Sequence, residues 1–167
     1  VEKVEDNTKI KVISNNKWCK DFSDRFKQHE IEENKILKNT LKLLPNNSYI
    51  IDVGGHVGDT GIYLAKILND YHKYKNIKII LIEPDKSKLD FVKKMCKLNN
   101  LDNIILVNKG VGEKKGKCSI IKNPPPGHER HPGSWKLKIN SGNIDIDTLD
   151  NICKNKNISL LHLDVEG

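Results

Sequence analysis

The stretch SYIIDVGGHVGDTGIYLAKIL, residues 48–68, decides the fold class of this chain. Its apolar run 49–53 is too short for a helix and is bounded by turn residues, as is typical of a strand buried on both faces. Four glycines follow, and after them apolar residues return at helical spacing. The stretch therefore predicts a strand, a glycine-rich turn and a helix that Asp59 and Thr60 can cap.

The same alternation of buried strand and amphipathic helix repeats along the chain. The apolar runs 77–82 and 103–107 predict two more strands with a helix at 86–99 between them, and 158–165 predicts a fourth strand. Strands and helices that alternate at this spacing favour right-handed crossovers and a parallel sheet. We therefore expect an α/β fold.

The remaining segments have shorter patterns. We expect a strand at 8–13, an extra strand at 116–122, a short helix at 148–155, and one helix from Trp18 to Leu44 with Phe22, Phe26, Ile36, Leu37, Leu41 and Leu44 on its apolar stripe. We divide the chain into an N-terminal strand and helix, 1–47, that pack on the core, and a ligand-binding domain, 48–167.

Composition narrows the classes of function. A chain of 167 residues can form one domain with a sizeable core. The formal net charge is +7, but its lysines are interleaved with acids, so nucleic acid is the less favoured partner. The four cysteines are widely separated, as is typical of reduced thiols. No apolar window has the length of a membrane span, and we expect a soluble, cytoplasmic protein.

The glycine turn is expected to hold a ligand, because ligands of open parallel sheets bind at the carboxyl ends of the strands. A dinucleotide fingerprint needs glycine at its first, third and sixth positions. Counted from Gly54, the third position is His56 and the sixth is Asp59, so the fingerprint does not match. A phosphate loop is excluded because no Gly-Lys-Ser or Gly-Lys-Thr follows. Asp52 and Asp59 suit a cationic group instead, such as an ammonium or a sulfonium.

Another carboxylate, on the next predicted strand, supports this interpretation independently. Glu83 ends the strand pattern IILIEPD, where it can accept hydrogen bonds from both hydroxyls of a ribose. S-adenosylmethionine joins a ribose to a sulfonium and an ammonium, so the sequence favours it as the cofactor. The alternative interpretation of Asp52 and Glu83 is a helix cap or a surface salt bridge.

The chain resembles the FkbM family of S-adenosylmethionine-dependent methyltransferases in three ordered blocks: SYIIDVGGHVGDTGIYLAKIL, IILIEPDKSKLDFVKKMCKLNNLDNIILVNKGVGEKKGKCSI and IDIDTLDNICKNKNISLLHLDVEG. The resemblance covers roughly 49–167 and implies a Rossmann-like class I methyltransferase sheet of parallel strands with flanking helices. It implies cofactor contacts from Asp52, Gly54, Gly55, His56 and Gly58 on the methionine side, from Glu83 at the ribose, and from Pro84, Asp85, Asn108 and Lys109 around the adenine. We add Asp59 and Thr60, which follow the turn. His56 departs from the small amide common at its position in the family.

The end of the chain supplies the predicted catalytic residues. The block LHLDVEG places Asp164 and Glu166 at the tip of the fourth strand, and in the family this block lies at the active site. A carboxylate there can take the hydroxyl proton, with Asp164 our first choice and Glu166 our second; the alternative is that both cap a following helix. The family has about three further strands, so we expect a fragment or a half that another chain completes.

The proline-rich loop NPPPGHERHPGSWK, 123–136, is the candidate acceptor segment. His128, Arg130, His131 and Trp135 suit recognition of a substrate, with the tryptophan stacking on a sugar, although a solvent-facing lid fits equally. The histidines lack the spacing of a zinc site, so we expect no metal.

Together these features predict methyl transfer from S-adenosylmethionine to a hydroxyl, with a sugar of a glycan as the acceptor. The alternatives are an RNA methyltransferase, which the basic charge suggests, and a noncatalytic cofactor-binding module, which the apparently missing strands suggest.

Overall fold

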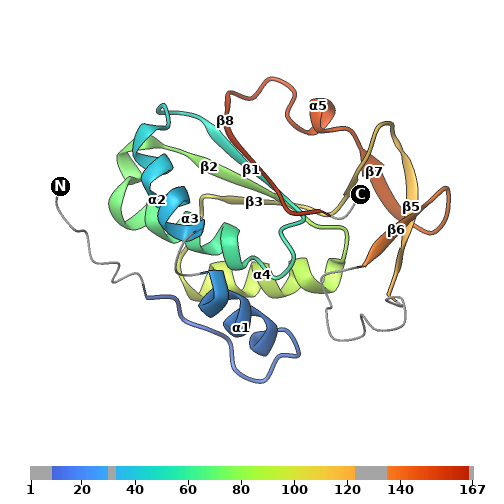
Figure 1. The fold of residues 1–167 in the computed structure, drawn as a ribbon, viewed down its shortest axis with the longest axis horizontal. Helices are drawn as coiled ribbons and strands as arrows, with labels where there is room; N and C mark the ends of the chain where they lie inside the picture. Colours follow the sequence, from blue (N-terminus) through green and yellow to red (C-terminus); the bar gives the residue numbers. More distant parts are fainter. Residues whose placement is uncertain (1–8, 30–32, 123–134, 166–167) are drawn as a thin grey trace.

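A computed structural model describes residues 9–29, 33–122 and 135–165 (Figure 1). In chain order its elements are α1 (Cys19–His29), α2 (Glu33–Leu43), β1 (Tyr49–Val53), α3 (Asp59–Tyr71), the 3-10 helix η1 (Lys73–Lys75), β2 (Lys78–Ile82), α4 (Lys86–Leu98), β3 (Ile104–Val107), β4 (Gly110–Val111), β5 (Gly116–Ile121), β6 (Lys136–Ile139), β7 (Ile144–Asp147), α5 (Leu149–Ile152) and β8 (Ile158–Leu163).

The main sheet has the strand order β3-β2-β1-β8, and every pair in it is parallel. This confirms the predicted Rossmann-like α/β fold and all four of its expected strands. The order reverses between β1 and β8, because the chain crosses back over β1 after β3. In such sheets ligands bind outside the carboxyl ends of the strands at this switch point.

The two faces of the main sheet are covered unequally. One face carries Ile50, Ile79 and Leu81, which are at most 1% exposed and share one core with buried side chains of α1, α2, α3 and α4. The other face carries a smaller cluster built on Ile51 and Val53, against which partly buried residues from β4 and α5 pack. The helices of the N-terminal segment thus belong to the same core as the sheet.

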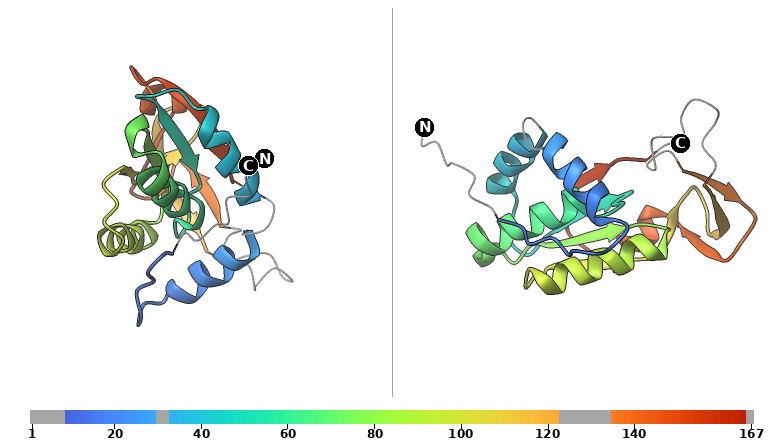
Figure 2. Two further views of the ribbon diagram at one scale, coloured as in Figure 1. Left: turned by 90° about the vertical axis from the view of Figure 1, so that its left-hand side faces the viewer. Right: turned by 90° about the horizontal axis from the view of Figure 1, so that it is seen from below.

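A second sheet, with the order β4-β7-β5-β6, lies beyond one end of the main sheet (Figures 1 and 2). The sequence predicted only β5 of these four strands. Cys118 of β5 and Ile146 of β7 are 0% and 4% exposed and form the buried side of this sheet. The other three cysteines, like Cys118, are free thiols, as predicted.

The prediction of one helix from Trp18 to Leu44 is wrong, because α1 and α2 are separate helices. A helix of that length would extend about 40 Å, which exceeds the diameter of a small domain. Two shorter helices both pack on α3 instead. Five of the six predicted stripe residues contact the core, but Ile36 is 68% exposed.

Two further local predictions are wrong. Residues 9–13, the described part of the expected strand, form no strand, because this segment hydrogen-bonds to a side chain: the N–H of Lys11 donates to Asn99 Oδ1 at 2.8 Å, and Asn99 Nδ2 donates to the Lys11 carbonyl at 2.9 Å. The N-cap of α3 is Gly58, in the left-handed region with φ 80°, and Asp59 begins the helix without capping it. Within the described ranges, the helices are too short or too polar to cross a membrane.

Candidate functional site

A cavity of about 630 Å³ lies at the carboxyl ends of the main strands. One wall is formed by the ends of β1, β2 and β8, through Val53, Ile82 and Leu163. The facing wall comes from the second sheet, through residues such as Ile120 and Leu137. The second sheet therefore closes a space that the main sheet alone would leave open.

The turn between β1 and α3 brings backbone close to the tip of β8. Gly54 has φ +81°, and a Cβ built on it would lie 2.1 Å from the carbonyl oxygen of Asp164. A Cβ on Gly55 would lie 2.3 Å from the side chain of Leu81. The Asp164 N–H donates to the Val53 carbonyl at 3.1 Å, so the two strand tips are joined beside this contact. Only glycine fits at position 54 without moving backbone.

Glu83 lies at the tip of β2, is 5% exposed and lines the cavity. Its Oε2 accepts the His56 N–H at 3.1 Å, and its Oε1 accepts the Asp85 N–H at 2.8 Å. Burial raises the pKa of Glu83, while the nearby Lys88 and these two backbone donors oppose the rise. Each oxygen keeps a further lone-pair direction, so the carboxylate can accept two more hydrogen bonds.

Helix α1 closes the side of the cavity next to the glycine turn. His56, with φ 45° and 7% exposure, has its Nε2 3.6 Å from Asp21 Oδ2 and its ring 6.3 Å from the ring of Trp18. Arg25, one turn after Asp21, lines the cavity, and its Nε lies 3.2 Å from Asp21 Oδ1. The N-terminal segment therefore contributes charged side chains to the site.

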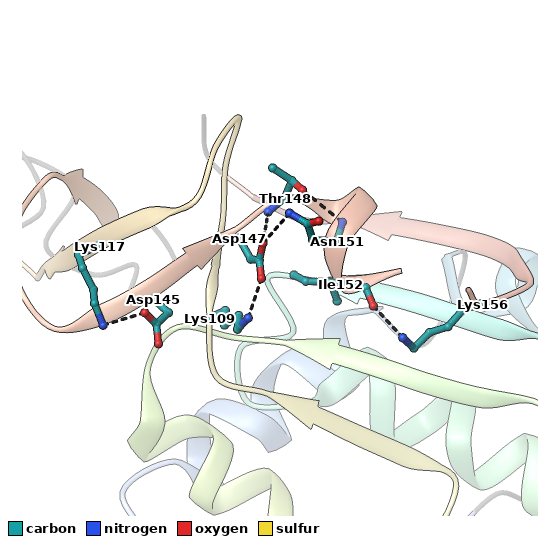
Figure 3. A network of polar contacts seen from close by, with 8 residues as sticks. All are labelled: Lys109, Lys117, Asp145, Asp147, Thr148, Asn151, Ile152 and Lys156. Atoms are coloured by element: carbon teal, nitrogen blue, oxygen red, sulfur yellow. Dashed lines mark hydrogen bonds and ion pairs between the residues drawn. The ribbon is translucent and has the colours of Figure 1, made fainter. Parts of the chain in front are cut away.

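The loop after β3 is tied to the tip of β2 and to the second sheet. Asn108 Nδ2 donates to the carbonyls of Glu83 and Pro84 at 3.0 and 2.8 Å. Lys109 lines the cavity, and its Nζ lies 2.7 Å from Asp147 Oδ2 (Figure 3). The other oxygen of Asp147 accepts from the start of α5, which fixes β7 and α5 beside the loop (Figure 3).

Asp52 faces away from the cavity. It is 1% exposed, and its Oδ1 lies 2.9 Å from Nδ1 of His162, its register partner on β8. A Cβ on Gly61 of α3 would lie 2.9 Å from Asp52 Oδ2, so the carboxylate is packed under the helix. This arrangement connects β1, β8 and α3 below the glycine turn.

The structure brings only part of the predicted site together. The predicted residues that line the cavity are Gly54, His56, Glu83, Pro84, Lys109, Trp135 and Asp164. Those described but outside its lining are Asp52, Gly55, Gly58, Asp59, Thr60, Asp85 and Asn108. Asp85 is the N-cap of α4 and accepts from the Ser87 N–H at 2.8 Å. His128, Arg130, His131 and Glu166 lie outside the described residues.

Sequence reasoning missed Lys88, Arg25 and the lining from the second sheet. Lys88 is 3% exposed and lines the cavity, although a lysine is rarely buried. Its spacing of four and seven from Val92 and Met95 puts it on the buried stripe, and this signal was available. Among the described residues, no group of three His, Cys, Asp or Glu is arranged to hold a metal ion.

Comparison with known proteins finds no matching family model and no matching curated protein. Similar solved structures include the methyltransferase FkbM from Methylobacillus flagellatus, with 18% identity, a TM-score of 0.43, and coverage of 72% of this chain but 26% of that one. A coclaurine N-methyltransferase bound to N-methylheliamine and SAH has 18% identity and a TM-score of 0.35, covering 44% and 20% of the two chains.

A SAM-dependent methyltransferase from Aquifex aeolicus has 16% identity and a TM-score of 0.35, covering 52% of this chain and 46% of that one. The chain therefore spans less than half the length of each of these proteins.

Proposed function

We propose that the chain binds S-adenosylmethionine in the cavity and transfers its methyl group to a hydroxyl, with a sugar of a glycan as the acceptor. The observation that carries the proposal is Glu83: a buried carboxylate, held by two backbone donors, in the same cavity as the glycine turn. The switch point of a parallel sheet is where an adenosine-containing ligand is expected.

The residues of the cavity fit such a cofactor. Glu83 would accept hydrogen bonds from the two ribose hydroxyls through its remaining lone pairs. Because Gly54 has no Cβ, the backbone of the turn can approach the amino-acid part of the cofactor closely. Asp164 lies across the switch point from Glu83 and would face the positive charge of the cofactor.

In this proposal Asp164 also assists the reaction. Bound S-adenosylmethionine supplies a methyl group on a positively charged sulfur, and transfer of that group to the acceptor oxygen leaves S-adenosylhomocysteine. The carboxylate of Asp164 is exposed at the cavity wall, where it can orient the acceptor hydroxyl and take its proton. Holding the hydroxyl in line with the methyl group supplies much of the acceleration of such a displacement.

Titration calorimetry with S-adenosylhomocysteine tests cofactor binding. We expect binding by the wild-type chain and at least a ten-fold loss in Glu83→Gln, because an amide accepts at only one of its two positions. Glu113→Gln, an exposed acid outside the cavity lining, is the matched control and should bind like wild type. No binding by the wild-type chain would refute the proposal.

Methyl transfer from labelled cofactor tests catalysis and the acceptor. We expect Asp164→Asn to abolish transfer to an oligosaccharide while binding of S-adenosylhomocysteine, which lacks the sulfonium charge, is retained. Binding without transfer to any acceptor would instead indicate a noncatalytic module. Transfer to RNA that weakens steeply with salt would replace the glycan by a nucleic acid as acceptor.

A further inference from the structure

Lys88 is a buried lysine at the cavity wall. It lies in the first turn of α4, is 3% exposed and lines the cavity. Its Nζ lies 4.2 Å from the ring centroid of Trp135 and 5.6 Å from that of Trp18. The two indole rings are 6.1 Å apart with planes inclined at 68°, so the ammonium sits in the corner between them.

The ammonium of Lys88 has no hydrogen bond or ion pair with any described residue. Glu83 acts on it only through space, since the Glu83 oxygens accept from backbone N–H groups. Burial lowers the pKa of Lys88, and the charges of Glu83 and Asp85 oppose that change. Aromatic faces compensate only part of the cost of removing an ammonium from water. A buried cation of this kind gains most from an anion that arrives in the cavity.

The charges around the cavity also favour an anion. Of the residues that the structure describes, four cations line it, Arg25, Lys88, Lys109 and Lys136, against two carboxylates, Glu83 and Asp164. Arg25 is paired with an acid of α1 and Lys109 with an acid of β7, each outside the lining. Lys88 is the buried cation whose hydrogen-bonding capacity is unused among the described residues.

We propose that Lys88 is the anion-binding side chain of this cavity and receives a carboxylate or phosphate group. Two sources carry that chemistry: the carboxylate of the cofactor's own amino-acid part, and an acidic group on the acceptor. Naming these two sources rests on the proposed function, whereas the proposal that Lys88 binds an anion does not depend on it. In the second case the acceptor is an acidic saccharide rather than a neutral one.

The first experiment uses inorganic phosphate as the probe. Trp18 and Trp135 are the two tryptophans of the chain, so an anion at Lys88 Nζ should change the tryptophan emission. At constant ionic strength we expect a saturable change in wild type. Lys88→Met should weaken it at least ten-fold, while Lys93→Met, which removes an exposed lysine of the same helix, should leave it unchanged. Lys88→Gln replaces the methionine variant if thermal melting shows that the latter does not fold.

The second experiment identifies the source of the anion by calorimetry. S-adenosylhomocysteine has a carboxylate, and 5′-methylthioadenosine has the same nucleoside without the amino-acid part. If Lys88→Met weakens binding of the first at least ten-fold and of the second hardly at all, the anion is the cofactor's carboxylate. If the affinity ratio is unchanged but the phosphate response is lost, the anion belongs to the acceptor.

The two proposals fail separately. Failure of both ligands to bind the wild-type chain would refute the proposed cofactor, and the phosphate titration would still decide the role of Lys88. The anion site is overturned if Lys88→Met changes neither the phosphate response nor the ratio of the affinities for S-adenosylhomocysteine and 5′-methylthioadenosine. If the wild-type chain itself gives no phosphate response and Lys88→Met weakens both ligands equally, the anion site is also overturned, because Lys88 would then act only through Glu83.

Discussion

Gly54→Ala is the most direct test of how the site is built. The new Cβ would meet the backbone carbonyl of Asp164 at 2.1 Å and Val165 Cγ1 at 2.9 Å, at a residue with φ +81°. A left-handed conformation costs a non-glycine residue about 1–2 kcal/mol. The carbonyl is backbone and can move only by disturbing the hydrogen bond between the Asp164 N–H and Val53, worth about 1 kcal/mol.

Gly116→Ala is the matched control, since a Cβ there meets nothing within 4 Å. Both substitutions lower the entropy of the unfolded chain by a similar amount, so that contribution cancels in the comparison. We expect Gly54→Ala to be less stable than Gly116→Ala by about 2–3 kcal/mol in guanidinium unfolding with an unchanged slope. A difference below about 0.5 kcal/mol would refute the close approach between the β1 turn and the tip of β8.

Three further predictions concern the core, the N-terminal segment and the cavity. Leu41→Ala, at 0% exposure, should cost about 2–5 kcal/mol of unfolding free energy, whereas Leu43→Ala, at 85% exposure, should stay within about 0.5 kcal/mol of wild type. Asn99→Ala should lose about 1–3 kcal/mol, because the backbone groups of Lys11 lose their partners; an unchanged denaturation midpoint would contradict this. Burial raises the pKa of Glu83 above its usual 4.5, and protonation removes the charge that would accept the ribose hydroxyls. Calorimetry should therefore show the cofactor affinity falling as the pH drops, with a midpoint above 4.5. Glu83→Gln should not show this pH dependence.

The main sheet could be predicted because its strands are buried on both faces. Such strands are nearly continuous apolar runs, and β1 occupies the predicted residues 49–53. The helix after each strand repeats its apolar residues at a period that short strands cannot imitate. Local sequence therefore carried most of the information about this layer.

The second sheet could not be predicted in the same way. β4 has two residues, and β6 (KLKI) and β7 (IDID) have four each, with polar residues alternating along them. Their pairing depends on contacts between segments that are distant in sequence, as Cys118 with Ile139 and Ile144 illustrate. A strand of this length is defined by its partners rather than by its own residues.

Within the site, the position of Glu83 could be predicted from the sequence pattern, whereas that of Asp52 was misjudged. Glu83 follows the last residue of β2, and its place at the strand tip could be predicted from the end of the apolar run. Asp52 lies inside β1, where side chains alternate between the faces: Ile51 and Val53 face one layer, so Asp52 shares the helix-covered face with Ile50. Alternation along the strand would have directed Asp52 under α3, whereas its position near the glycines suggested a ligand.

The charges of Glu83 and Lys88 depend on each other. Burial favours the neutral form of both, raising the pKa of the acid and lowering that of the amine, and the field of each opposes the shift of the other. Removing the Lys88 charge is therefore expected to raise the pKa of Glu83 further and to move the acid limit of the proposed ribose binding to higher pH. Lys88→Arg keeps the charge and leaves that limit in place. The charge of Lys88 favours the ionised form of Glu83, and an anion bound at Lys88 would weaken that effect, so the ligand groups at the two residues are coupled.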